Sequence, residues 1–176
     1  MPGKGLFSRF VLIPFFISPL VLAYSWDTIF GHQGYLTVLV RALGLPTWDL
    51  FSLGGMIVVT AMFYAPNAYL QCTASLALTD PQLEDAARIA GANPFLALWR
   101  ITVPLLRPAI TFSALFIFVS SVEMLAIPLI LGNPVNIQVL PTYLYRIGVI
   151  GSPPDYGQLA VASILLVGVI IFLVAI

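Results

Sequence analysis

The side chains best placed to form ion pairs and helix caps gather in residues 80–106, between two long apolar runs of a chain that is only 8% charged. Asp80 and Pro81 are typical of a helix start, because Asp caps free backbone N–H groups and Pro fits the first helical turn. Glu84 and Arg88 are four residues apart, a spacing that allows an ion pair along one side of a helix. This chemistry is structural rather than catalytic.

A face of small residues lies in the same segment. Its members are Ala86, Ala87, Ala90 and Gly91. Gly91 is expected to end the first helix, because Gly tolerates the left-handed geometry of helix ends. Asn93-Pro94 is expected to start a second helix and Val103-Pro104 to end it. The segment is therefore expected to be a compact helix-turn-helix between two membrane spans.

The spacing of these residues resembles the cytoplasmic coupling loop of ABC-transporter permeases of the binding-protein-dependent importer type. That loop reads Glu-Ala-Ala, three residues, Gly, nine residues, Ile, one residue, Leu-Pro. The corresponding residues here are Asp85, Ala86, Ala87, Gly91, Ile101, Val103 and Pro104, with conservative departures at Asp85 and Val103. An ordinary interfacial loop helix with a Pro stop is the alternative, and it explains the caps but not the joint spacing.

In that family the loop docks into a groove on an ATPase subunit, which requires small residues that allow close backbone approach. The resemblance implies ATPase contacts for a set of nine residues. They are Glu84, Asp85, Ala86, Ala87, Arg88, Ala90, Gly91, Ile101 and Pro104.

Several other classes of site are disfavoured by composition. Lys4 is the only lysine and is not in a Gly-rich phosphate-binding loop, so ATP hydrolysis must come from another polypeptide. His32 and Cys72 are each single, which gives no histidine metal cluster, no internal disulfide and no Ser/His/Asp or Cys/His set. The net charge is zero, which does not suggest a nucleic-acid partner. We expect a transport subunit that is not an enzyme and binds no cofactor or metal of its own.

Apolar runs define the fold class. Hydrophobic residues make up 60% of the chain, which is typical of a membrane protein. Four runs approach the roughly 20 residues that cross a bilayer, at about 9–29, 51–73, 107–130 and 157–176. The first resembles a secretory signal, but Pro14 and Pro19 interrupt it and no clear cleavage site follows. The sequence predicts an all-α, polytopic transmembrane helix bundle, and the resemblance makes it a type I ABC importer permease.

Basic residues predict the orientation. If residues 80–107 are cytoplasmic, that side holds five of the seven basic residues, namely Lys4, Arg9, Arg88, Arg100 and Arg107. The other side holds Arg41 and Arg146, in agreement with the positive-inside rule. Loops 30–50 and 131–156 then face outward, and the location is a bacterial inner membrane. Because family members carry a further span before the segment that resembles residues 7–30, the chain is expected to be an incomplete permease domain.

Glu123 is the ionisable residue deepest within an apolar run. A charged side chain at mid-membrane costs about 2.5–3.5 kcal/mol on insertion scales, so such residues usually face the bundle interior or water. Two interpretations are open. Glu123 lines the translocation path, or its carboxyl group is satisfied by Ser120, Ser121 or a neighbouring helix.

Pro66 and Asn67 interrupt the second apolar run. Pro removes a helical hydrogen bond, so the pair predicts a break or kink with freed carbonyl groups. Within a pore this would be a polar hinge beside Tyr64 and Tyr69, and otherwise a kink covered by packing. Tyr64 and Asn67 are therefore candidates for the path, together with Glu123.

Residues 137–148 of the outer loop suit a short amphipathic helix between Pro and Gly breakers. Tyr143 and Tyr145 would anchor it at the membrane interface. Contact with a substrate-delivering binding protein is the alternative role.

Residues 121–124, 128–132 and 153–157 resemble the ferric-iron branch of these permeases. Related branches for thiamine, phosphonates, polyamines, sulfate and molybdate share much of this layout. The resemblance implies four kinds of partner: ABC ATPase subunits, a periplasmic or lipoprotein substrate-binding protein, a second permease domain or homodimer partner, and membrane lipid. A secondary transporter or channel with a broken helix at Pro66-Asn67, or an inactive permease fragment, are the alternatives.

Overall fold

The computed structural model describes residues 4–78, 93–151 and 155–175, and every regular element within those ranges is helical. The first part contains α1 (Lys4–Leu12), the 3-10 turn η1 (Ile13–Phe16), α2 (Pro19–Phe30), α3 (Tyr35–Ala42) and α4 (Leu53–Ala77). The second contains α6 (Pro94–Ala97), η2 (Leu98–Thr102), α7 (Val103–Val122), α8 (Ala126–Leu131), η3 (Asn133–Val135), α9 (Leu140–Tyr145) and η4 (Arg146–Ile150). The last part is α10 (Tyr156–Ala175).

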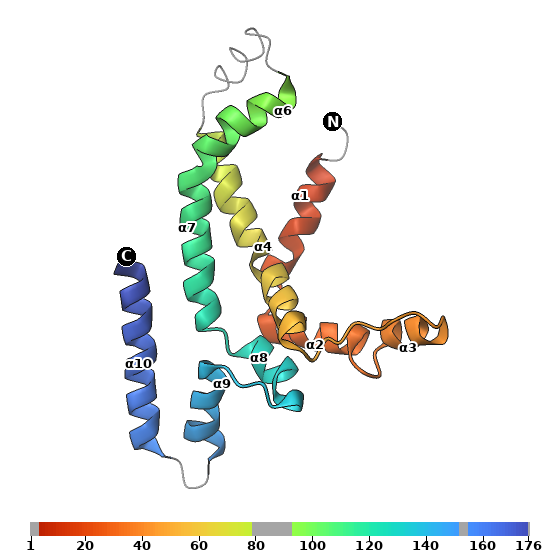
Figure 1. The fold of residues 1–176 in the computed structure, drawn as a ribbon, viewed down its shortest axis with the longest axis vertical. Coiled ribbons are helices and arrows are strands. Elements are labelled where there is room, and N and C mark those ends of the chain that lie inside the picture. The colour runs from red at the N-terminus through yellow and green to blue at the C-terminus, as the bar shows by residue number, and fades with distance from the viewer. Residues whose placement is uncertain (1–3, 79–92, 152–154, 176) are drawn as a thin grey trace.

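Three helical stretches of the described residues are long and apolar enough to cross a membrane: Leu53–Ala77, Leu98–Val122 and Tyr156–Val174. A helix of 25 residues is about 37 Å long, which exceeds the roughly 30 Å hydrocarbon core of a bilayer. The stretches in α4 and α7 pack side by side and antiparallel, whereas α10 stands apart and contacts α7, α9 and η4 (Figure 1). None of the residues in the apolar stretch of α10 is fully buried, as expected of a helix with a large lipid-facing surface.

The first apolar run does not form one straight span, in contrast to the predicted range 9–29. The stretches Ser8–Phe16 and Pro19–Ala42 are bent by 109°. Pro14 lies in the 3-10 turn, and Ile17 and Ser18 have extended backbone with ψ of 132° and 141°. Pro19 then takes the first position of α2, where a missing N–H costs nothing. As a result α2 and α3 run across the end of the bundle (Figure 1).

The third apolar run is also divided, in contrast to the predicted range 107–130. α7 ends at Val122, and α8 begins at Ala126 and turns away to pack on α2 and α4. Pro128 explains the division, because it has no N–H to donate to the carbonyl four residues earlier. In the first turn of α8 that donor is not needed.

The hydrophobic core lies where α2, α4 and α8 meet. Leu22, Val59, Ile127 and Leu131 are buried there, three of them with no exposed surface. Gly132 allows the chain to fold back at this point, since a Cβ atom would lie 2.6 Å from the carbonyl oxygen of Ile137. The core therefore fixes how α8 closes one end of the bundle.

The two ends of the bundle carry different elements. The start of α1, the end of α4 and helix α6 lie toward one end, and α3, α8 and α9 lie at the other (Figure 1). The end of α4 and the start of α6, which flank residues 79–92 in sequence, both lie at the first end.

Candidate functional site: the α4–α7 cavity and the two ends of the bundle

Seven of the nine residues expected to contact an ATPase lie outside the described residues: Glu84, Asp85, Ala86, Ala87, Arg88, Ala90 and Gly91. The other two, Ile101 in η2 and Pro104 in α7, are half-buried. The expected helix start after Asn93 is confirmed, because the Asn93 side-chain oxygen accepts a hydrogen bond from the Leu96 N–H at 2.7 Å.

The expected helix end at Val103-Pro104 is wrong. The π-helical turn η2 leads directly into α7, and Leu98–Val122 forms one continuous helical stretch. Pro104 lies in the first turn of α7, where Pro is tolerated. The segment that follows α4 is therefore joined to α7 through a continuous helix.

A cavity of about 330 Å³ lies between the first half of α4 and the second half of α7. Its lining residues are Leu53, Met56, Ile57, Thr60, Ala61, Tyr64, Ile117, Ser121 and Val139. Most of these side chains are apolar, and the hydroxyl-bearing ones are Thr60, Tyr64 and Ser121. The cavity resembles a small-molecule site in this mixture of apolar walls and a few polar groups.

Tyr64 is held at this cavity by a hydrogen bond across the helix interface. Its ring is buried, and its hydroxyl group donates to the backbone carbonyl of Ser120 in α7 at 2.8 Å. The ring of Phe63 packs edge-on against it, with centroids 5.0 Å apart. The predicted path residue Tyr64 thus connects the two helices that enclose the cavity.

Glu123 follows the last residue of α7 and is exposed. Its carboxylate acts electrostatically on the Tyr64 hydroxyl group, so the structure brings these two predicted residues near each other. The Ser121 hydroxyl group donates to the Phe118 carbonyl at 2.8 Å rather than to Glu123. The exposed carboxylate of Glu123 therefore lies near the end of α7, within electrostatic range of Tyr64.

Asn67 lies one turn after Tyr64 in α4 and is half-buried, whereas Pro66 is fully buried. The predicted break at Pro66 is not present, because α4 is one helix from Leu53 to Ala77. The carbonyl group of Met62 loses its usual partner, since Pro66 has no N–H. The helix continues through Pro66 despite this missing donor.

Two further hydrogen bonds link helices of the bundle, and Ser8, Gln71 and Ser113 among their partners were not singled out in the sequence. Ser113 of α7 donates to the side-chain oxygen of Gln71 in α4 at 2.8 Å. Tyr69 of α4 donates to the Ser8 hydroxyl group of α1 at 2.9 Å. The available sequence signal for the first pair was spacing, because Tyr64 and Gln71, like Ser113 and Ser120, are seven residues apart and share one helix face.

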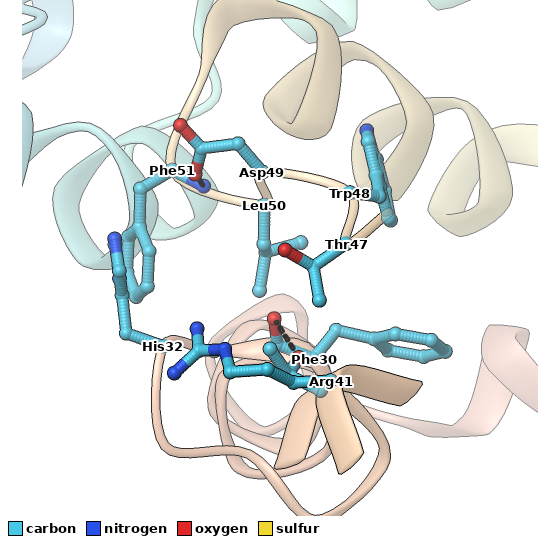
Figure 2. A pocket seen from close by; sticks show the side chains of 10 residues that line it. Phe30, His32, Arg41, Thr47, Trp48, Asp49, Leu50 and Phe51 are labelled. Carbon is cyan, nitrogen blue, oxygen red and sulfur yellow. Dashed lines mark hydrogen bonds between the residues drawn. The ribbon is translucent and has the colours of Figure 1, made fainter. Parts of the chain in front are cut away.

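A second, polar cavity of about 130 Å³ lies at the other end of the bundle, beside the end of α2, α3 and residues 47–51. Figure 2 shows Arg41 and His32 on one side of it and Thr47, Asp49 and Leu50 across from them. The His32 ring stacks on Phe51, with centroids 4.8 Å apart. His32 therefore lines this cavity.

The described residues contain no group of three or more His, Cys, Asp or Glu side chains that could hold a metal ion. Cys72 is half-buried in α4.

Residues 2–176 match the model of a protein family described as the inner membrane component of binding-protein-dependent transport systems. The chain belongs to this family. This membership confirms the predicted resemblance to importer permeases. Together with the apolar helices, it also confirms the prediction of a multi-pass inner-membrane protein. The members of the family are components of transport systems.

Curated relatives include two ferric permeases. The putative ferric transport system permease protein FbpB 1 of Haemophilus influenzae is 28% identical over 151 residues, which cover 85% of this chain and 23% of that protein. The ferric transport system permease protein FbpB of Actinobacillus pleuropneumoniae is 26% identical over 169 residues, covering 94% and 24%. The chain therefore spans about a quarter of the length of these relatives.

Relatives named for other solutes also match. The sulfate transport system permease protein CysW of Synechocystis is 29% identical over 117 residues, covering 65% of this chain and 41% of that protein. The trehalose transport system permease protein SugA of Mycobacterium tuberculosis is 34% identical over 116 residues, covering 65% and 38%. The names of the relatives thus span three kinds of solute.

The fold matches a solved transporter structure. A chain of a bacterial alginate ABC transporter, in complex with an alginate pentasaccharide-bound periplasmic protein, superposes with a TM-score of 0.79 at 22% identity. The match covers 97% of this chain and 62% of that one. The predicted all-α, ABC permease-like fold is confirmed.

Proposed function

We propose that the chain is a permease segment of an ABC importer, which moves a small solute across the inner membrane and is driven by ATPase subunits on separate chains. One observation carries the proposal. The two helices that enclose the cavity, α4 and α7, are also the two helical stretches joined by the segment that resembles an ATPase-docking loop. A displacement of that segment is therefore transmitted directly to the walls of the cavity.

The translocation path runs along the α4–α7 cavity, and Tyr64, Asn67 and Glu123 contribute to it. Tyr64 supplies a buried hydroxyl group between the helices, and Glu123 supplies a charge at the outer end of α7. Polar and ionisable groups within membrane spans usually mark a path of this kind, because they are costly elsewhere.

Ferric iron is the solute that we propose to test first. The two ferric relatives match over 85% and 94% of this chain, whereas the sulfate and trehalose relatives each match over 65%. The proposed partners are ABC ATPase subunits, a substrate-binding protein and a second permease domain. The secondary-transporter alternative depends on a broken helix at Pro66-Asn67, and α4 is not broken there.

The decisive experiment is reconstitution in liposomes. The protein would be purified with its ATPase and its binding protein, and ATP hydrolysis would be measured with ferric iron, sulfate or trehalose. The proposal requires ATP hydrolysis and solute uptake that depend on the binding protein. Uptake driven by an ion gradient without ATP would contradict the importer function, and stimulation by sulfate or trehalose alone would contradict only the choice of solute.

A further inference from the structure

The polar cavity at Arg41 adjoins an apolar one. This apolar cavity has a volume of about 170 Å³, and Leu36, Val40 and Pro46 line it but not the polar cavity. The two cavities share Phe30, Thr37, Thr47 and Trp48. A polar site beside an apolar site matches a ligand with a polar head and an apolar chain.

The polar cavity presents charges of both signs. The guanidinium group of Arg41 lies on one side of it and the carboxylate of Asp49 on the other (Figure 2). One Asp49 oxygen accepts a hydrogen bond from the Phe51 N–H at 3.0 Å, which fixes the carboxylate at the cavity. The guanidinium group of Arg41 makes no hydrogen bond or ion pair with the described residues, so its donors remain available. A complementary ligand carries both an anionic and a cationic group.

The position of the cavities indicates the source of the ligand. Leu50 and Phe51 line the polar cavity just before α4 begins at Leu53. Because a helix of 25 residues exceeds the hydrocarbon core of a bilayer, the start of α4 falls in the headgroup region. Trp48 is of a type enriched at this depth, and Leu39 and Leu43 add exposed apolar surface beside the cavities.

We propose that these joined cavities bind one phospholipid of the ethanolamine class. The phosphate group contacts Arg41, the ammonium group contacts Asp49, and an acyl chain occupies the cavity between Leu36, Val40 and Pro46. Arg is well suited to phosphate because its planar donors match phosphate oxygens, and an ammonium group is attracted by a carboxylate. The site rests on the membrane location of the chain and not on the proposed solute.

Native mass spectrometry of the full chain in detergent tests the site. We expect one phosphatidylethanolamine to remain bound, with phosphatidylglycerol binding more weakly because it lacks the ammonium group. Arg41→Gln should weaken the phosphatidylethanolamine complex about tenfold, the loss expected for one charged hydrogen bond. Asp49→Asn should remove the preference between the two lipids, and Val40→Trp should weaken both by filling the apolar cavity. Arg146→Gln is the matched control, as an exposed arginine at the same end of the bundle.

The outcomes that would overturn the proposal are distinct. Equal retention of phosphatidylethanolamine by the wild type and Arg41→Gln would show that the lipid binds elsewhere. Displacement of the lipid by inorganic phosphate or glycerophosphoethanolamine would show a site for a soluble anion. Normal lipid retention by Arg41→Gln together with weaker capture of the soluble binding protein would assign the cavity to that partner. Thermal unfolding of each variant establishes that it is folded, and Arg41→Lys, which keeps the charge, should retain most of the binding.

Discussion

The hydroxyl group of Tyr64 in α4 donates to the backbone carbonyl of Ser120 in α7 at 2.8 Å, and Tyr64 also lines the cavity between these helices. Two helical turns further along α4, Gln71 accepts from Ser113 at 2.8 Å. Between the two hydrogen bonds, the residue number rises by seven in α4 and falls by seven in α7, as expected of antiparallel helices. Together the two bonds fix the register of α4 against α7.

Tyr64→Phe should weaken the α4–α7 pair without creating a cavity, because it removes only the hydroxyl group. We expect the free energy of unfolding to fall by about 1 kcal/mol, the typical value of one hydrogen bond. Unfolding by SDS in mixed micelles measures this. Tyr143→Phe is the control, because Tyr143 is 42% exposed. Equal losses in both variants would show that the bond to Ser120 adds no stability.

The pairing of Gln71 with Ser113 predicts coupled effects of substitution. Gln71→Ala and Ser113→Ala should give losses that are not additive, with a coupling energy of about 0.6 kcal/mol, the average for hydrogen bonds between membrane helices. A double-mutant cycle measures that coupling. The cycle of Gln71→Ala with Ser163→Ala, on the separate helix α10, should be additive. Additive losses in the first cycle would mean that the bond is not formed in the folded protein.

The positions of the proline residues predicted only some of the places where the helices are interrupted. The sequence predicts a break or kink at Pro66, an interruption of the first apolar run at Pro14 and Pro19, and a third span that continues through Pro128. In the structure α4 continues through Pro66, the chain bends before Pro19, and a new helix starts shortly before Pro128. Pro removes only one donor, so its effect depends on whether it lies within a helix or in the first turn of one. Pro66 is fully buried within α4. Pro19 and Pro128 instead begin new helices that close one end of the bundle.

The candidate site was predicted only in part for a similar reason. Tyr64 and Glu123 stand out as polar residues within apolar runs, and the structure places them near each other. Gln71 and Ser113 are also polar residues within apolar runs. Their pairing, however, depends on the register of two helices that are separated in sequence by residues 78–102. The cavity at Arg41 depends on how residues 30–41 meet residues 47–51, which composition and periodicity did not indicate.

Glu123→Gln and Glu123→Ala separate a role in transport from a role in packing. Glu123 is exposed and follows the last residue of α7, so neither variant should change the free energy of unfolding by more than about 0.5 kcal/mol. We expect solute uptake per assembled complex to fall in both, because both remove the charge. Full uptake by Glu123→Gln would show that the charge has no part in transport.

The positions of the basic residues predict the orientation in the membrane. A reporter fused after Arg100 should indicate the cytoplasm, and one fused after Asn136 should indicate the periplasm. The structure is compatible with this assignment, because η2 and η3 lie at opposite ends of α7 (Figure 1). The opposite pattern of reporter activity would reject both the orientation and the proposed ATPase contact.

Gly91→Arg tests the proposed coupling segment itself. Gly91 lies outside the described residues, so the prediction depends on the spacing of the small residues and on the continuous helix from Leu98 to Val122 that follows them. A long side chain at Gly91 should prevent close approach of the ATPase, while membrane insertion, which depends on the apolar spans, is unchanged. We expect copurification of the ATPase and solute uptake to be lost at normal protein levels. Gln82→Arg is the control for added charge, because Gln82 is not among the residues expected to contact the ATPase. Normal uptake by Gly91→Arg would mean that the ATPase docks elsewhere on the chain.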